Sequence, residues 1–140
     1  MAFKVLQVDH VGIGVKDLQE TKKFYSEQLG IKHLPEDEVV EEQKVKVSFF
    51  PCGDAELEFL ETTTPDGPIG KFIEKNNGRN GIQHVALRVD NIENAIADLM
   101  AKGVRMIDEK PRYGAGGSSI AFVHPKATGG VLLELCQRMK

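Results

Sequence analysis

The chain is poor in the residues that mark several special classes of protein. Its 140 residues include two cysteines and no tryptophan, and no apolar run approaches the roughly 20 residues of a membrane span. Cys52 and Cys136 provide neither a disulfide framework nor a zinc-ligand spacing. The first residues lack the apolar core of a signal peptide. We therefore expect a cytoplasmic protein that does not enter a membrane.

Positive charge is scarce as well. The chain has 18 Lys and Arg against 21 Asp and Glu, and its net charge is −3. A nucleic-acid-binding domain would normally carry a basic face, so nucleic acid is not an expected partner. The composition, 41% hydrophobic and 28% charged, is typical of a globular protein. A chain of this length is sufficient for one domain with a buried core.

Two distant segments of the sequence follow one pattern. Residues 9–15 and residues 83–89 each place a histidine, His10 or His84, ahead of alternating apolar residues, which indicates a strand. The two histidines are 74 positions apart (84 minus 10). Such a repeat at matching positions indicates that one structural unit occurs twice in the chain.

A second pair of repeated positions supports the duplication. Glu58 and Glu134 each lie inside an apolar strand segment, and they are 76 positions apart (134 minus 58). Between the histidine strand and the glutamate strand, each copy begins a helix, capped at Asp17 or near Asn91. The order strand, helix, strand, strand, strand is therefore predicted twice.

The boundaries of the elements follow from the same pattern. The glycines Gly30 and Gly103 are suited to end the two helices. We expect the second strand of each half at about 31–34 and 104–107, and a solvated acidic loop at 36–42. The expected division of the single domain 1–140 is module one at about 5–61, a linker with a short helix at about 62–80, and module two at about 81–137.

Each module is too small to cover both faces of its sheet. One face packs on its helix, and the other must be closed by the sister module. We therefore predict an α+β fold of two tandem βαβββ modules whose curved sheets form one metal-binding cleft. Such a cleft is a natural site for a small molecule.

The two-residue period of a strand predicts which side chains enter this cleft. The aliphatic residues of each strand should pack on the helices. His10, Glu58, His84 and Glu134 then all point to the opposite face, and Cys136 is expected as a small wall residue there. A carboxylate in such a strand is costly to bury unless it is paired or bound to a cation. Two imidazoles and two carboxylates suit Zn²⁺, Co²⁺, Ni²⁺ or Mn²⁺, with open positions for substrate.

The same residues carry a resemblance to a known family. The doubled pattern with its His and Glu positions resembles the vicinal-oxygen-chelate superfamily of glyoxalases, bleomycin resistance proteins and dioxygenases. Within it, the chain is similar to the methylmalonyl-CoA epimerases over nearly its whole length. The segments that carry this similarity are residues 9–15, 69–72, 77–86, 108–111 and 124–132.

The resemblance implies an isomerase that inverts the α-carbon of methylmalonyl-CoA through a metal-stabilised enolate. It also implies a divalent metal ion, most often Co²⁺, an acyl-CoA substrate and a homodimer. By position, His10, His84 and Glu134 match the metal ligands of the family, and Glu58 matches a fourth ligand. Some epimerases have a catalytic glutamate on the third strand, where this chain has Val47. The resemblance therefore leaves the second acid/base open. The equivalent positions of Glu58 and Glu134 in the two halves supply a candidate pair, with Glu134 as the surer base and Glu58 as ligand and partner base.

Two other functions remain open. A lactoylglutathione lyase (glyoxalase I) would use the same ligand pattern, although residues 4–9 contain no arginine to hold a glutathione carboxylate. A metal-free small-molecule-binding protein of the same fold would leave both inward glutamates unexplained. The glycine-rich run 113–118 is either a lid or cradle for the pantetheine arm or a plain hairpin. Lys71, Lys75 and Lys126 either meet the nucleotide phosphates or are solvated.

Overall fold

The computed structural model describes residues 2–139, which divide into two compact units. The N-terminal unit is His10–Gln83, and the C-terminal unit contains residues 2–9 and 84–139. Strand β1 (Val5–Gly14) therefore begins in the C-terminal unit and continues in the N-terminal unit. The sequence repeat and the compact units thus have different boundaries at the start of the chain.

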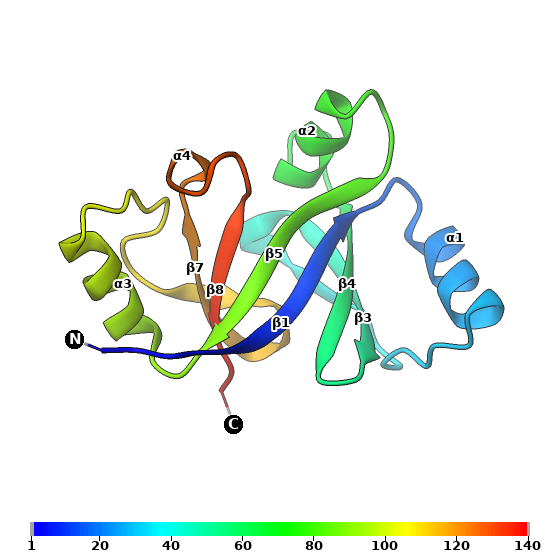
Figure 1. Ribbon diagram of the computed structural model, residues 1–140. Helices are drawn as coiled ribbons and strands as arrows, with labels where there is room; N and C mark the ends of the chain where they lie inside the picture. Colours follow the sequence, from blue (N-terminus) through cyan, green and yellow to red (C-terminus); the bar gives the residue numbers. More distant parts are fainter. Residues whose placement is uncertain (1, 140) are drawn as a thin grey trace. The chain divides into compact units, whose positions relative to one another are not determined.

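The N-terminal unit contains a four-stranded sheet in the order β2-β3-β4-β1. Figure 1 labels β1, β3 and β4 of this sheet. Strands β1 and β4 are parallel, and the other two pairs are antiparallel. Its remaining elements are α1 (Leu18–Lys23), a π-helical turn (Phe24–Gln28), β2 (Glu38–Val40), a 3₁₀ turn (Glu41–Gln43), β3 (Val45–Cys52), β4 (Ala55–Thr62) and α2 (Pro68–Lys75).

The C-terminal unit repeats this arrangement in the order β5-β8-β7-β6, again with one parallel pair, β5 with β8. Its elements are β5 (Gly81–Val89, with its first three residues in the N-terminal unit), α3 (Ile92–Ala101), β6 (Arg112–Gly114), a 3₁₀ turn (Ala115–Gly117), β7 (Ser118–Val123), α4 (Pro125–Thr128) and β8 (Leu133–Gln137). The predicted α+β class with two tandem βαβββ modules is confirmed.

Helices α1 and α3 begin and end as the sequence predicts. The Asp17 side chain accepts a hydrogen bond from the Glu20 amide at 3.1 Å, and the Asn91 side chain accepts one from the Asn94 amide at 2.9 Å. These bonds satisfy amide groups that have no partner inside the helix. After each helix, a glycine takes the left-handed conformation, Gly30 with φ 72° and Gly103 with φ 84°.

The aliphatic face of each sheet packs on its own helix. In the N-terminal unit, Phe50 and Phe59 are fully buried with Val15 and Leu18 of the α1 region. In the C-terminal unit, the corresponding cluster joins β5, β7 and β8 to α3, with Leu135 among its buried members. The predicted orientation of these strands is therefore confirmed. Among the described residues, no helix is long and apolar enough to cross a membrane.

The prediction of the second strand was wrong in both halves, and in the same way. Residues 31–34 and 104–107 form no strand, and the pairing strands are β2 and β6, six to eight residues later. The predicted segments make only isolated bonds to the next strand, such as the Leu34 amide to the Phe49 carbonyl and the Ile107 amide to the Phe122 carbonyl. Pro35 and Pro111, which lack an amide hydrogen, lie between these bonds and the true strands. The acidic segment expected as a loop includes β2.

Candidate metal centre

In the N-terminal unit, His10 lies on the face of β1 that also carries Gly12 and Gly14. Glu58 of β4 is paired with Gly12 in the parallel register, so its carboxylate leaves the sheet on the same face. The distance from His10 Nδ1 to Glu58 Oε2 is 3.3 Å, and each side chain is 4% exposed. The strand register therefore forms a buried histidine–glutamate pair within this unit.

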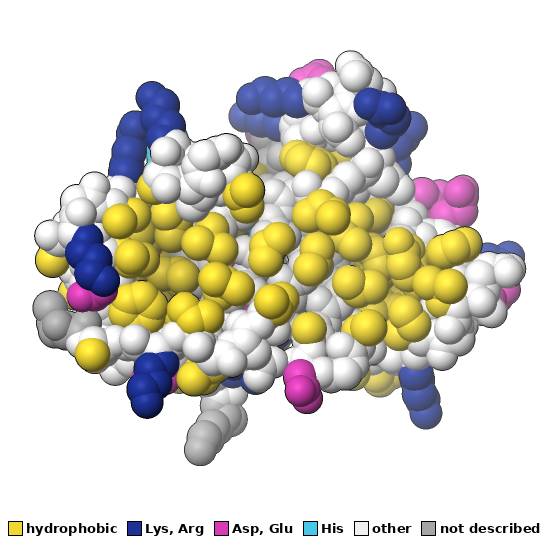
Figure 2. Space-filling view, viewed as in Figure 1, with side chains coloured by type: hydrophobic (Ala, Val, Ile, Leu, Met, Phe, Trp, Pro, Cys, Tyr) yellow, Lys and Arg dark blue, Asp and Glu magenta, His cyan; other side chains and the backbone are white. Residues whose placement is uncertain are grey.

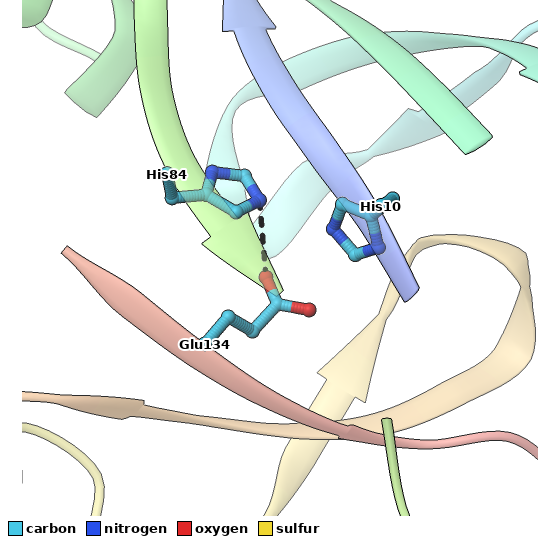
Figure 3. Close-up of side chains that lie close together, drawn as sticks. All are labelled: His10, His84 and Glu134. Carbon is cyan, nitrogen blue, oxygen red and sulfur yellow. Dashed lines mark ion pairs between the residues drawn. The ribbon is translucent and has the colours of Figure 1, made fainter. Parts of the chain in front are cut away.

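The C-terminal unit forms an equivalent pair. Glu134 of β8 is paired with Ala86, two residues after His84 in β5. The distance from His84 Nε2 to Glu134 Oε1 is 3.2 Å, and the side chains are 6% and 5% exposed (Figure 3). The ring of Phe122 meets the His84 ring edge-on, with 5.6 Å between the ring centroids. This contact limits the orientations open to the imidazole.

The strands on both sides of each glutamate also correspond. Each glutamate has a small residue opposite it on the parallel strand and a phenylalanine opposite it on the antiparallel strand. These neighbours are Gly12 and Phe49 for Glu58, and Ala86 and Phe122 for Glu134. The small residues leave space above the sheet beside each carboxylate, and the phenylalanines shield the other side from water.

The chemistry of each pair suits a divalent cation. A carboxylate that is almost completely buried loses hydration and needs a compensating partner. An imidazole nitrogen and a carboxylate oxygen are donors that Zn²⁺ and other first-row divalent ions accept. Each unit therefore holds two buried donors of the required kind, and the residues present fit a metal ion.

Position 47 itself carries no acid, because it is a valine. Val47 is 1% exposed and is paired with Leu60 of β4 on one side and with Glu38 of β2 on the other. Glu58, two residues from Leu60 in the same strand, is the nearest acidic side chain on that face of β4. Within β4, Glu58 is therefore the acidic side chain closest in sequence to Leu60 on this face.

Sequence analysis missed two sets of contacts around these pairs. Arg112 lies with its guanidinium carbon 5.5 Å from the centre of the Phe122 ring, behind the ring that meets His84. Asp9, next to His10, is fully buried and binds Arg88 and Arg138. A charged residue inside a predicted strand was the available signal for Asp9, but no local pattern predicts its partners.

The glycine-rich run, the three lysines and the two remaining histidines lie in turns, on the surface, in an irregular segment or at a helix end. The glycine-rich run forms the end of β6 and a 3₁₀ turn before β7, and Gly116 and Gly117 have positive φ angles of 80° and 79°. Lys71, Lys75 and Lys126 are exposed. His33 lies in a segment without regular structure, and His124 caps α4 by accepting a hydrogen bond from the Lys126 amide.

Cys136 is a packed thiol and not a nucleophile. It is fully buried and clusters with Ala86, Ile120 and Phe122 on the face that carries Glu134. Burial, reinforced by the negative charges of Asp9 and Glu134, raises the pKa of the Cys136 thiol to about 12. The thiol therefore stays protonated at neutral pH, as expected for a wall residue.

Comparison with known proteins identifies relatives of the chain. Residues 9–122 match the family model of the glyoxalase/bleomycin resistance protein/dioxygenase superfamily. The mitochondrial methylmalonyl-CoA epimerase of Homo sapiens is 38% identical, over 94% of this chain and 73% of the human protein.

Solved structures agree with this relationship. The crystal structure of methylmalonyl-CoA epimerase from Mycobacterium tuberculosis has a TM-score of 0.91 and 33% identity, covering 97% of this chain and 90% of that one. A methylmalonyl-CoA epimerase in complex with methylmalonyl-CoA and NH4+ has a TM-score of 0.87 and 36% identity, covering 96% of this chain and 95% of that one. The similarity therefore extends through both βαβββ modules.

The two cysteines should differ sharply in reactivity. Cys52 is exposed, whereas Cys136 is buried and its pKa is raised to about 12. We expect iodoacetamide at pH 8 to alkylate Cys52 in the folded protein and to leave Cys136 unmodified until the protein is denatured. Peptide mass spectrometry measures both sites, with the denatured protein as the control. Alkylation of Cys136 as fast as Cys52 would contradict the buried, protonated thiol.

Proposed function

Because the chain belongs to the glyoxalase/bleomycin resistance protein/dioxygenase superfamily and is similar to methylmalonyl-CoA epimerases along nearly its whole length, we propose that it is a metal-dependent epimerase of methylmalonyl-CoA. The observation that carries this proposal is the pair of buried histidine–glutamate contacts at equivalent positions of the two units. A purely structural sheet has no need of two such pairs. Glu58 and Glu134 would otherwise be costly to bury.

The proposed site unites the two pairs around a single divalent ion. Its ligands are His10 and Glu58 from the N-terminal unit and His84 and Glu134 from the C-terminal unit. The mixed nitrogen and oxygen donors agree with Co²⁺, our first choice, and also with Zn²⁺, Ni²⁺ or Mn²⁺. The bound ion supplies Lewis-acid stabilisation of the negative charge that develops when a proton leaves the α-carbon.

The two glutamates perform the proton transfers in this proposal. Ionised Glu134 removes the α-proton from one face of the acyl group, and the electron pair of the broken C–H bond enters the enolate. Protonated Glu58 returns a proton to the opposite face, which inverts the carbon. After one turnover Glu134 is protonated and Glu58 ionised, so the site is ready for the reverse direction. Exchange of these protons with water resets it.

The imidazoles position these carboxylates. Each histidine contacts one glutamate, at 3.3 Å for His10 and 3.2 Å for His84, and so restricts the rotamers of that glutamate. Phe49 and Phe122, opposite the two glutamates, keep water from one side of each carboxylate. A carboxylate that is held in place and partly dehydrated is a better base toward a weakly acidic C–H bond than a solvated one.

We also propose a homodimer and a reducing, cytoplasmic location. In the N-terminal unit, Ile13 and Leu57 of the helix-facing side are only half-buried, and in the C-terminal unit Val85 and Leu87 are likewise. Hydrophobic side chains gather over both halves on the face drawn in Figure 2. Apolar surface of this kind typically marks a protein interface. Two free cysteines agree with a reducing compartment.

The metal and the reaction are tested together. In D₂O, the metal-loaded protein should incorporate deuterium at the α-carbon of methylmalonyl-CoA, and chelation should abolish the exchange until Co²⁺ is restored. His84→Ala and Glu134→Ala should lower the metal content measured by plasma mass spectrometry, because each removes a ligand. Full metal occupancy in both variants would contradict the ligand set. Turnover of the methylglyoxal–glutathione adduct without exchange in methylmalonyl-CoA would favour a lactoylglutathione lyase.

The acid/base role of Glu58 has its own test. In Glu58→Gln the amide cannot carry a proton between substrate and solvent, so epimerisation should fall by about 10²–10⁴-fold. Deuterium exchange should persist only for the enantiomer whose proton Glu134 removes. The matched control is Glu56→Gln, two residues earlier on the same face of β4. This variant should keep normal turnover. Full turnover and exchange in both substrate directions by Glu58→Gln would refute the role.

The dimer is tested by light scattering. We expect the purified protein to have twice the mass of one chain, because the apolar helix-facing surface would otherwise remain hydrated. Leu87→Lys, which places a charge on this surface, should shift the mass toward that of one chain. The control is Ile107→Lys, at an apolar residue that is 49% exposed and lies outside the strands. A wild-type mass equal to one chain at micromolar concentration would rule out the dimer.

A further inference from the structure

Asp9 and two arginines form a charged cluster within the C-terminal unit. Asp9 is fully buried. Arg138 donates to both of its oxygens, from Nη2 to Oδ1 at 2.6 Å and from Nε to Oδ2 at 2.8 Å. Arg88 donates from Nε to Oδ2 at 2.9 Å. Arg138 alone therefore gives each oxygen of the carboxylate a strong, charge-assisted hydrogen bond.

Asp9 already accepts hydrogen bonds from Arg138 and does not require Arg88 as a second partner. One carboxylate facing two guanidiniums leaves a net positive charge on the cluster. A second arginine held at a carboxylate that is already satisfied loses side-chain entropy for a single additional hydrogen bond. The position of Arg88 is explained if its guanidinium, which Asp9 holds in place, binds a further group such as a ligand.

Arg88 lies close to the proposed metal ligands of its unit. It is on the face of β5 that carries His84 and Ala86, because side chains two residues apart share a face. Ala86 is paired with Glu134, and Arg88 is paired with Cys136 in the same register. The Cα atoms of Arg88 and Ala86 are therefore about 7 Å apart, given a rise of about 3.3 Å per residue. Arg88 and Glu134 therefore lie on the same face of the sheet, two residues apart in the register of β5 and β8.

The outer edge of Arg88 is available to a ligand. Within the part of the chain that the structure describes, the side chain of Arg88 makes one hydrogen bond, from Nε to Asp9. The side chain is 29% exposed, and its hydrogen bond to Asp9 uses Nε and leaves the two terminal amino groups as further donors. Glu134, the nearest carboxylate on this face, is already paired with His84. A planar pair of amino groups of fixed orientation is the preferred partner of a carboxylate or a phosphate.

We propose that Arg88, held in place by Asp9 and Arg138, binds an oxyanion of the acyl-CoA substrate. The inference rests on the proposed function, since a free carboxylate and phosphates are the anionic groups of that substrate class. Arg88 makes the contact, and Asp9 and Arg138 are positioning residues. The shared chemistry is bidentate recognition of an anionic oxygen pair beside Glu134.

Binding calorimetry with three ligands tests the proposal on the metal-loaded protein. Malonyl-CoA carries both anionic groups, propionyl-CoA lacks the free carboxylate, and the malonyl thioester of pantetheine lacks the phosphates. Arg88→Met keeps the length of the side chain and removes its donors. We expect it to bind malonyl-CoA at least about tenfold more weakly than wild type, the usual loss for a charged hydrogen bond. Arg105→Met, at an exposed arginine of the same unit, should bind like wild type.

The two shorter ligands identify the anion. A loss that persists with propionyl-CoA and disappears with the pantetheine thioester assigns Arg88 to a phosphate, and the reverse assigns it to the carboxylate. Arg88→Lys, which keeps a charge beside Asp9, should fold with a wild-type melting temperature and recover part of the affinity. Wild-type affinity of Arg88→Met and Arg88→Lys for all three ligands overturns the inference while leaving the epimerase proposal intact. Failure of wild type to bind any of them overturns both.

Discussion

The cost of burying a carboxylate inside a sheet governs the central features of this protein. Glu58 and Glu134 lie in the middle of apolar strands and are 5% exposed or less. Several kcal/mol would be lost for each if it had no partner. In both units the strand register brings a histidine two residues along the neighbouring strand, and a small residue opposite the carboxylate leaves room for it. Loss of either histidine would remove a compensating partner from a buried carboxylate.

The parts of this arrangement that depend on local pattern could be predicted from the sequence. Two-residue periodicity placed His10, Glu58, His84 and Glu134 opposite the aliphatic face, and the aliphatic face does pack on the helices. Helix caps and glycine stops were equally predictable, because each depends on residues within one turn of the helix. The duplication strengthened both inferences, because each pattern occurs once in each half of the chain.

The parts that depend on tertiary contacts could not be predicted. The true second strands, β2 and β6, are three residues long. The segments before them, 31–34 and 104–107, have sequences more typical of strands. The position of β2 and β6 is set by the ladder with β3 and β7, not by their own composition. The contact of Asp9 with Arg138 joins residues 129 positions apart, and no sequence spacing indicates it.

Strand β1 shows why the two repeats are not independent modules. The backbone of Lys4 exchanges bonds with Asp90, and Phe3 packs on the cluster around α3, so the first residues of the strand are part of the C-terminal unit. From His10 onward the strand belongs to the N-terminal unit. The boundary between the two units falls between Asp9, which binds two arginines, and His10, which contacts Glu58. His10 is thereby restrained from both directions along the chain, and restraint of this kind would hold the proposed ligand in one geometry without rearrangement.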